Sequence, residues 1–241
     1  MTKLPGKVLS PGFAYGRVYV IQDDADILPS MQSTGDQKQI LEDAISAASA
    51  KLYEQMQTAT LLFNDRISVI FEVHRLMISD PALLETTYRL IEEGKSAYDA
   101  YKQASEEVIL LFKKLDNEYM RHRIVDIEDA TSRVLYTIQS KTYEVNLKFE
   151  DSRIIIMKQM KPSIIFACEK NDVLGFVTEN GTYNQHAAII ARTKDLVSMI
   201  VPGIYGYNIK NGDFLFIDGD HSTVYINPPH DFVNKQLEER R

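Results

Sequence analysis

Residues 177–192 read VTENGTYNQHAAIIAR and combine an apolar run, a polar loop and an apolar helical pattern. The β-branched residues before Glu179 indicate a strand, and Asn180-Gly181 indicates a turn. The alanine and isoleucine residues that follow predict a helix whose first turn begins near His186. A strand followed by a loop and a helix is typical of α/β sheets, so this segment predicts an α/β domain with a histidine at a helix N-terminus.

Strand-sized apolar runs recur on both sides of this segment. Pro162-Ser163 predicts another helix start, because proline is favoured in the first turn of a helix. Near the N-terminus, residues 7–21 indicate two extended pieces separated by Pro11-Gly12. The alternation of strands and helices predicts one α/β sheet domain. The strand-sized runs of its C-terminal part are 154–157, 173–177, 197–201, 214–217 and 224–226.

From about Gly35 to Thr142 the sequence has a helical period interrupted by a single glycine, Gly94. Four one-sided apolar stripes must pack against one another to be buried, which predicts a helical bundle. Because extended segments lie on both sides, we expect this bundle to be inserted into the sheet domain. The expected divisions are 1–32 and 145–230 for the sheet domain, 33–144 for the four-helix bundle and 231–241 for the start of a linker helix. The stripes are Ile40, Ala44, Ala47, Ala48, Leu52 and Met56; Ile67, Ile70, Phe71, His74, Met77 and Ile78; Tyr101, Ala104, Val108, Leu111, Phe112 and Leu115; and Met120, Ile124, Ile127, Val134 and Ile138.

The chain has 241 residues and a formal net charge of −7, from 27 Lys and Arg against 34 Asp and Glu. This acidic balance, without a Lys- or Arg-rich tract, argues against nucleic acid as the main partner. The single cysteine, Cys168, excludes an internal disulfide or a thiolate metal cluster and agrees with a reducing compartment. The histidines lack metal-ligand spacing, so we expect no metal site in this chain. Without a signal-like N-terminus or a run of 18 apolar residues, the expected location is the cytoplasm.

His186 and Arg192 are the candidates for chemistry in the predicted helix. A helix N-terminus presents unpaired N–H groups and a partial positive charge, and both favour an anion. A neutral imidazole in that position is a nucleophile beside an anion-binding site, which suits phosphoryl transfer. The alternative is that the imidazole only caps or packs against the helix and that Arg192 is a solvated surface cation. Residue spacing leaves both interpretations open.

The segment resembles the phosphohistidine signature G-G-x-T-S-H-x-x-[IV]-x-A-R of enzyme I of the phosphoenolpyruvate:sugar phosphotransferase system, which is also found in pyruvate phosphate dikinase. Gly181 matches the first glycine and His186 the phosphorylated histidine, while Ile189, Ala191 and Arg192 match the helix. The resemblance to enzyme I extends, in order, over nearly the whole chain. The further matching segments are Ser10-Pro11-Gly12 with Gly16, Phe71-Glu72-Val73-His74, Ser79-Asp80-Pro81, residues 115–119 and 123–133, Asn211-Gly212-Asp213, Asp218-Gly219 and residues 224–228.

This resemblance implies a swivelling phosphohistidine sheet domain with an inserted helical subdomain that docks the small phosphocarrier protein HPr. It implies His186 as the phosphorylated nucleophile, the N–H groups of Ala187 and Ala188 as anion ligands, and Arg192 as a charge neutraliser. The family's phosphoenolpyruvate site and Mg²⁺ lie in a separate C-terminal barrel, whose linker would start at the end of this chain. We therefore expect phosphoryl exchange with phospho-HPr, no cofactor in this chain, and a monomer, because dimerisation of enzyme I is attributed to the barrel.

Five positions differ from the family pattern. Two of them are Thr182, which stands where the signature has its second glycine, and Val197, which replaces a proline common after the helix. Asn184 and Gln185 replace the Thr-Ser pair before the histidine, and Lys161 replaces the threonine of a Leu-Thr-Pro-Ser segment. The hydroxyls that meet the phosphoryl group are therefore missing, and we expect these three side chains to take their place. Two alternatives stay open. One is a non-catalytic module that still binds an HPr-like protein; the other is the mobile histidine domain of a dikinase-like enzyme, which His186-Ala187-Ala188 favours and the helical insertion disfavours.

The resemblance places the HPr-binding surface on the helical bundle. Acidic side chains there would steer a basic partner by charge complementarity. The position of His74 on an apolar stripe indicates a core or interface histidine rather than a catalytic one. The candidate partner-binding residues are Glu72, His74, Asp116, Glu118, Arg123 and Asp126.

Overall fold

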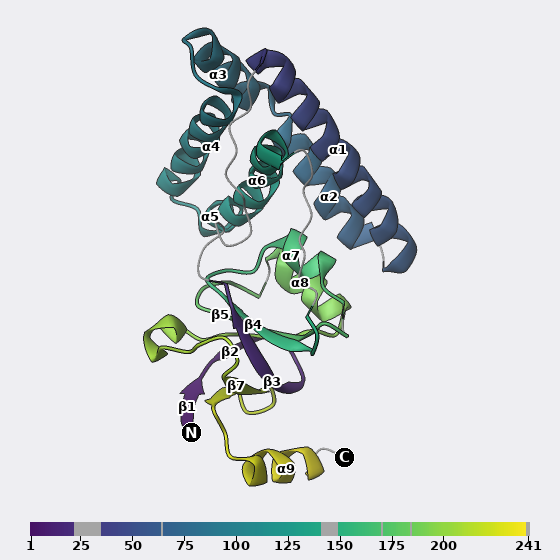
Figure 1. Cartoon of the computed structure of the whole chain (residues 1–241), viewed down its shortest axis with the longest axis vertical. Coiled ribbons are helices and arrows are strands. Elements are labelled where there is room, and N and C mark those ends of the chain that lie inside the picture. Colours follow the sequence, from purple (N-terminus) through teal and green to yellow (C-terminus); the bar gives the residue numbers. More distant parts are fainter. Residues whose placement is uncertain (22–34, 64, 141–148, 170, 184, 240–241) are drawn as a thin grey trace. The chain divides into compact units, whose positions relative to one another are not determined.

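The computed structural model describes residues 1–21, 35–63, 65–140, 149–169, 171–183 and 185–239. The chain divides into two compact units, a sheet unit (Met1–Asp26 with Val145–Arg241) and a helical unit (Ile27–Glu144) (Figure 1). The predicted α/β class with a helical insertion is confirmed. The domain boundaries expected after residues 32 and 144 fall within 22–34 and 141–148, which lie outside the described residues.

The described part of the sheet unit contains an eight-stranded mixed sheet in the order β1-β8-β7-β3-β4-β5-β6-β2. The central strands β3, β4, β5 and β6 run parallel to one another, and the remaining pairs are antiparallel. The helical unit separates β3 from its parallel neighbour β4 in the sequence. The strands are β1 (Thr2–Pro5), β2 (Lys7–Ser10), β3 (Phe13–Val20), β4 (Arg153–Met157), β5 (Val173–Thr178), β6 (Val197–Ile200), β7 (Phe214–Asp218) and β8 (Thr223–Ile226).

The central strands are apolar on both faces, as parallel strands covered on both sides usually are. In β4, the consecutive residues Ile154, Ile155 and Ile156 are all buried. On the antiparallel strand β7, the two faces of the sheet belong to different hydrophobic clusters. Leu215 and Ile217 are part of the main core, whereas Phe216 packs in a second cluster. This alternation follows from the two-residue period of a strand.

Three α-helices and a 3₁₀ helix complete the described part of the sheet unit. They are α7 (Pro162–Ala167), α8 (His186–Thr193), η2 (Ile204–Tyr207) and α9 (His230–Glu238). Helices α7 and α8 pack side by side (Figure 1). Helix α9 contributes Val233, Phe232 and Leu237 to the second cluster, against Phe216 and Tyr225 of the sheet. The helices expected at Pro162 and near His186 are thus present.

The described part of the helical unit contains six helices where a four-helix bundle was expected. They are α1 (Gln37–Leu62), α2 (Asp65–Ile78), α3 (Pro81–Glu92), α4 (Ala97–Lys114), α5 (Glu118–His122) and α6 (Ile124–Ser140). The last predicted stripe is divided between two helices, α5 and α6, and a further helix, α3, matches none of the stripes. Helix α3 buries Leu83, Thr87 and Leu90. These three residues follow a helical spacing, although this helix was not predicted from the sequence.

Two apolar stripes differ from their predicted course. In α1, Ala44, Ala48 and Leu52 are buried as predicted, whereas Ala47 is exposed and Leu41, which was outside the predicted stripe, is buried. In α4 the stripe is buried at Tyr101 and Ala104, but Leu111 is 63% exposed. The C-terminal part of α4 therefore presents apolar side chains at the surface of the helical unit.

Candidate functional site

His186 is the first residue of α8, and the loop that leads to it follows directly after β5. The preceding Gln185 has extended backbone angles (φ −65°, ψ 147°), as expected of an N-cap, but its side chain makes no capping hydrogen bond. The N–H groups of Ala187 and Ala188 belong to the first turn, where an α-helix offers no acceptor of its own. The helix start therefore combines an imidazole with backbone donors suited to an anion.

Gln185 closes the loop instead of capping the helix. Its Oε1 accepts a hydrogen bond from the Thr182 N–H (3.1 Å), and its own backbone N–H donates to the Thr182 carbonyl (3.3 Å). The side chain is buried. Gly181 makes this closure possible, because its φ of +155° disfavours other residues and a Cβ there would lie 3.2 Å from Gln185 Oε1.

Arg192, near the end of α8, reaches back to the loop before the helix. Its Nη1 donates to the carbonyl of Leu9 in β2 (2.9 Å) and to the carbonyl of Tyr183 (3.0 Å). Its Cζ lies 3.9 Å from the centroid of the Tyr183 ring, which is cation–π geometry. The guanidinium is thus held by backbone and ring contacts within the sheet unit.

Lys161 precedes the first turn of α7, and the side chain of Lys194, the residue that ends α8, reaches the C-terminal end of α7. Lys161 is the N-cap residue of α7, and its side chain makes no capping hydrogen bond there. The ammonium of Lys194, from α8, donates to the carbonyl of Phe166 (2.7 Å) and to that of Cys168, so it links the two helices. Burial lowers the pKa of Lys194.

Cys168 is buried, and burial raises the pKa of its thiol to about 12. The thiol is therefore protonated at neutral pH, and a thiol in that state is a poor nucleophile.

The described structure brings His186, Gln185 and Arg192 together in one loop and helix and places Lys161 on the neighbouring α7. Asn184 lies outside the described residues. Sequence reasoning missed Tyr183, because the matching position of the signature is variable and nothing local reveals a contact with a residue nine positions later.

The candidate partner-binding residues of the helical unit separate into an exposed and a buried group. Glu72, Asp116 and Glu118 are exposed. His74 is fully buried, and its Nε2 and Nδ1 lie 3.8 Å from Asp126 Oδ1 and 3.9 Å from Asp129 Oδ2.

Asp126 also accepts from Arg123 Nη1 at 3.3 Å. His74, Arg123 and Asp126 are therefore part of a polar cluster that joins α2 to the start of α6.

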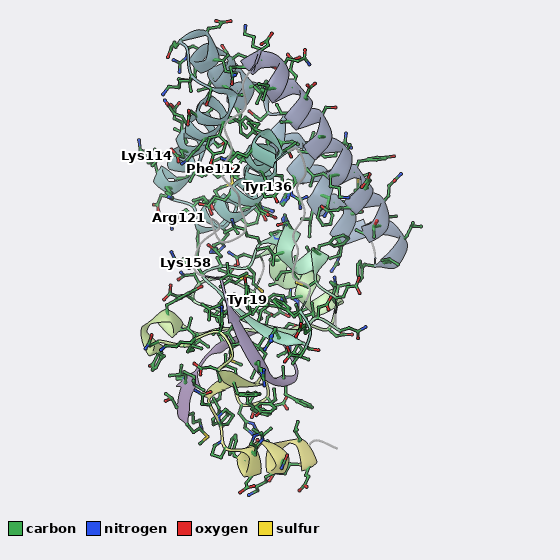
Figure 2. All side chains as sticks on the ribbon, in the orientation of Figure 1. Tyr19, Phe112, Lys114, Arg121, Tyr136 and Lys158 are labelled. Atoms are coloured by element: carbon green, nitrogen blue, oxygen red, sulfur yellow. The ribbon has the colours of Figure 1, made fainter. Side chains whose placement is uncertain are left out.

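The corner between α4 and α5 holds exposed apolar side chains that sequence reasoning had assigned to the core or not considered. Leu110, Leu111, Leu115 and Tyr119 are 41–63% exposed. Figure 2 shows Phe112 and Lys114 near the end of α4 and Arg121 on α5. Lys113, Lys114 and Arg121 are exposed beside Asp116 and Glu118, so this surface carries basic side chains as well as the acidic ones named from the sequence.

Among the described helices, none is both long and apolar enough to cross a membrane.

Comparison with protein families identifies the class. Residues 5–123 match the family described as PEP-utilising enzyme, N-terminal, and residues 149–222 match PEP-utilising enzyme, mobile domain. The first match includes β2, β3 and the helices α1 to α5, and the second includes β4 to β7. The two matches follow one another in the chain but do not coincide with the two structural units. The chain belongs to the PEP-utilising enzymes.

Within this family the chain is similar to the N-terminal part of phosphoenolpyruvate-protein phosphotransferase, which confirms the resemblance to enzyme I. The protein of that name from Geobacillus stearothermophilus is 29% identical over 240 residues, and the one from Staphylococcus epidermidis is 28% identical over 236 residues. These matches cover 98% and 96% of the chain. The chain spans 41% of the length of each of these relatives.

Solved structures show the same fold. The NMR solution structure of Enzyme I (nEIt) has a TM-score of 0.68 and 24% sequence identity, and covers 99% of this chain and 100% of that one. The structure named N-terminal domain of Enzyme 1 - Nitrogen has a TM-score of 0.61 and 15% identity, with 98% of each chain covered.

Proposed function

We propose that this chain transfers phosphoryl groups through a phosphohistidine at His186, between phosphoenolpyruvate bound outside the chain and the phosphocarrier HPr. The observation that carries the proposal is the position of His186 as the first residue of α8, beside the N–H groups of Ala187 and Ala188. A helix start binds the phosphoryl oxygens while the imidazole attacks phosphorus. The relatives named phosphoenolpyruvate-protein phosphotransferase support a transferase of the phosphotransferase system.

In the proposed reaction, a phosphoryl group passes from a phosphorylated histidine of the carrier to His186. A lone pair on one ring nitrogen of His186 forms a bond to phosphorus, and the bond between phosphorus and the donor nitrogen breaks. The electron pair of the broken bond returns to the donor imidazole. One proton moves from the other His186 ring nitrogen to the donor ring, so both imidazoles end with their normal valence. The negative charge on the transferred oxygens faces the helix N-terminus throughout.

The carrier would dock on the helical unit. Glu72, Asp116 and Glu118 are exposed and attract basic groups, and the exposed leucines at the end of α4 add apolar contact area. A mixed surface of this kind supports a transient partner that carries both basic and apolar groups.

The remaining parts of the reaction would lie elsewhere in the protein system. We assign phosphoenolpyruvate and Mg²⁺ to a C-terminal barrel domain, sugar uptake to the downstream carriers, and the protein to the cytoplasm. The 241-residue chain would be a monomer, and sedimentation that shows a stable dimer would contradict this assignment.

A direct test is to mix the 241-residue chain with phospho-HPr and to measure acid-labile, alkali-stable phosphate on the chain. The expected result is an adduct that His186→Ala abolishes. His230→Ala, which removes an exposed histidine from α9, is the matched control and should leave the adduct in place. An adduct that survives in His186→Ala would refute the proposal.

A second candidate, a binding module without catalysis, is favoured by one observation. The hydrogen bond from the Thr182 N–H to Oε1 holds the Gln185 side chain in the loop, at a position where the signature has a hydroxyl. Binding of HPr without any adduct would support this module. Charging of His186 by a nucleotide-binding donor domain, but not by the barrel of enzyme I, would instead support the mobile domain of a dikinase-like enzyme.

A further inference from the structure

We propose that Arg192 and Tyr183 act as positioning residues: together with the Leu9 carbonyl they form a loop clamp that fixes the backbone in front of His186. The inference rests on the proposed function, because fixing this loop matters only if His186 accepts a phosphoryl group. It assigns Arg192 a different role from the charge neutraliser expected from the sequence.

The clamp connects three separate parts of the sheet unit. Arg192 belongs to the C-terminal part of α8, Tyr183 to the loop before α8, and Leu9 to β2. A single nitrogen, Nη1, donates to the Leu9 carbonyl at 2.9 Å and to the Tyr183 carbonyl at 3.0 Å. The loop backbone is therefore attached to the sheet through a side chain that starts six residues after His186.

The Tyr183 ring provides the second contact of the clamp. It lies 3.9 Å from Cζ of Arg192, although Tyr183 itself is 49% exposed. A planar guanidinium stacks on an aromatic face and donates in its own plane at the same time, whereas an ammonium group does not. The geometry therefore requires arginine for its shape as well as for its charge.

Gln185 holds the other end of the same loop. Its Oε1 and its backbone N–H both pair with Thr182, so two hydrogen bonds join Gln185 to Thr182. Arg192 holds Tyr183, and Gln185 holds Thr182, so these two described residues before α8 are each fixed by a side-chain contact. Phosphoryl transfer needs near-attack geometry, and a displacement of about 1 Å lowers its rate by about a hundredfold.

The two roles of Arg192, charge neutraliser and clamp, predict different rates of phosphoryl transfer when the uncharged Tyr183 is replaced. If Arg192 serves only to neutralise phosphoryl charge, removal of the Tyr183 ring leaves the rate unchanged and Arg192→Lys is tolerated. If Arg192 is held in place by Tyr183, removal of the ring slows transfer without changing any charge on the protein.

The test uses the 241-residue chain and two phosphoryl donors, phospho-HPr and the small reagent phosphoramidate. Phosphoramidate loses ammonia as its nitrogen–phosphorus bond breaks and the bond to His186 forms, so it reports on the loop without carrier docking. The variants are Tyr183→Ala, Tyr183→Phe, Arg192→Lys and the double variant of Tyr183→Ala with Arg192→Lys. Tyr207→Ala is the matched control, because Tyr207 is 48% exposed and lies in η2 of the same unit.

The clamp predicts that Tyr183→Ala lowers the rate constant at saturating donor by about tenfold with either donor, with KM for phospho-HPr unchanged. Tyr183→Phe keeps the ring and should restore the rate to within about twofold, and Arg192→Lys should lose about tenfold to a hundredfold. Because the two residues act through one contact, the double variant should be no more than about twofold slower than Arg192→Lys. A wild-type rate constant in Tyr183→Ala, or a loss confined to KM, would overturn the clamp.

Amide hydrogen exchange separates this result from a failure of the proposed function. The amides of Gln185 and Ile189 are hydrogen-bonded to the carbonyls of Thr182 and Gln185, and they should exchange faster in Tyr183→Ala than in Tyr207→Ala, while exchange in β4 stays the same in both. If the wild-type chain accepts phosphate from neither donor, the proposed function fails, and the clamp is judged by exchange alone. Equal exchange at Gln185 and Ile189 in the two variants would then refute it.

Discussion

At the scale of single residues, the loop before His186 depends on a backbone conformation at Gly181 that residues with a Cβ atom disfavour. Gly181 has a φ of +155°, and an added Cβ would lie 3.2 Å from the Gln185 Oε1 that closes the loop. Strained backbone is found where a site must be fixed, and here it lies five residues before the candidate nucleophile. The glycine of the signature is thus explained by the conformation and by the close side-chain oxygen.

Gly181→Ala should therefore slow phosphorylation of His186 and destabilise the sheet unit by about 1 kcal/mol, because alanine disfavours this φ and crowds Gln185 Oε1. The matched control is Gly206→Ala, since an added Cβ at Gly206 meets no atom within 4 Å. Denaturant unfolding and the rate of labelling by phosphoramidate measure the two effects. Equal behaviour of the two variants would show that the loop tolerates a side chain at Gly181.

Cys168 gives a prediction on the alkaline stability of the sheet unit. Burial raises the pKa of its thiol from 9.0 to about 12, so the folded state keeps a proton that the unfolded state releases. A raised pKa contributes stability that is complete below the unfolded pKa and is lost as the pH rises through the folded one. Between pH 9 and pH 10, the unfolding free energy of the wild type should fall by about 1 kcal/mol more than that of Cys168→Ala. Parallel pH profiles of the two proteins would contradict this.

At the scale of elements, capping residues define helix starts that apolar periodicity leaves undefined. The side chain of Asp80 accepts from the N–H groups of Ala82 (2.9 Å) and Leu83 (3.3 Å), and Pro81 occupies the first position of α3. This combination is a standard helix-start pattern. In the sequence, Asp80-Pro81 belongs to a segment that resembles enzyme I, and the structure shows that these residues begin a helix.

Asp80→Ala should destabilise the helical unit by about 1 kcal/mol, because two N–H groups at the start of α3 lose their acceptor. Glu85→Ala removes the same charge from an exposed position of the same helix and serves as the control. Chemical denaturation followed by circular dichroism measures the difference. A cost in Glu85→Ala as large as in Asp80→Ala would assign the effect to charge rather than to capping.

The predictability of each element followed the strength of its local pattern. Strand β4 and helix α8 were predicted because three consecutive isoleucines and an uninterrupted alanine–isoleucine helix leave little ambiguity. Strand β1 was missed because only Leu4 among its residues is buried. The contact of Arg192 with Leu9 was beyond prediction, since 183 residues separate the two and only the folded sheet brings them together.

At the scale of the whole molecule, the site and the surface expected to bind the carrier lie in different units of the chain. His186, its loop and Arg192 belong to the sheet unit, whereas the exposed acidic and apolar side chains considered for docking belong to the helical unit. This division was predicted from the sequence through the change of hydrophobic period. The exposure of Leu111 was not predicted, because an apolar stripe on one helix does not reveal where the neighbouring helices end.

Changes in the helical unit should therefore alter carrier recognition without altering the reactivity of His186. Asp116→Lys reverses an exposed charge at the corner between α4 and α5, and it should raise KM for phospho-HPr severalfold at low salt by opposing association with a basic partner. The rate of labelling by phosphoramidate should stay unchanged, and the increase in KM should shrink as added salt screens the charges. Glu238→Lys changes the net charge equally but lies in α9 of the sheet unit, so it controls for long-range charge. Equal increases in KM in both variants would mean that overall charge, rather than this corner of the helical unit, governs the encounter.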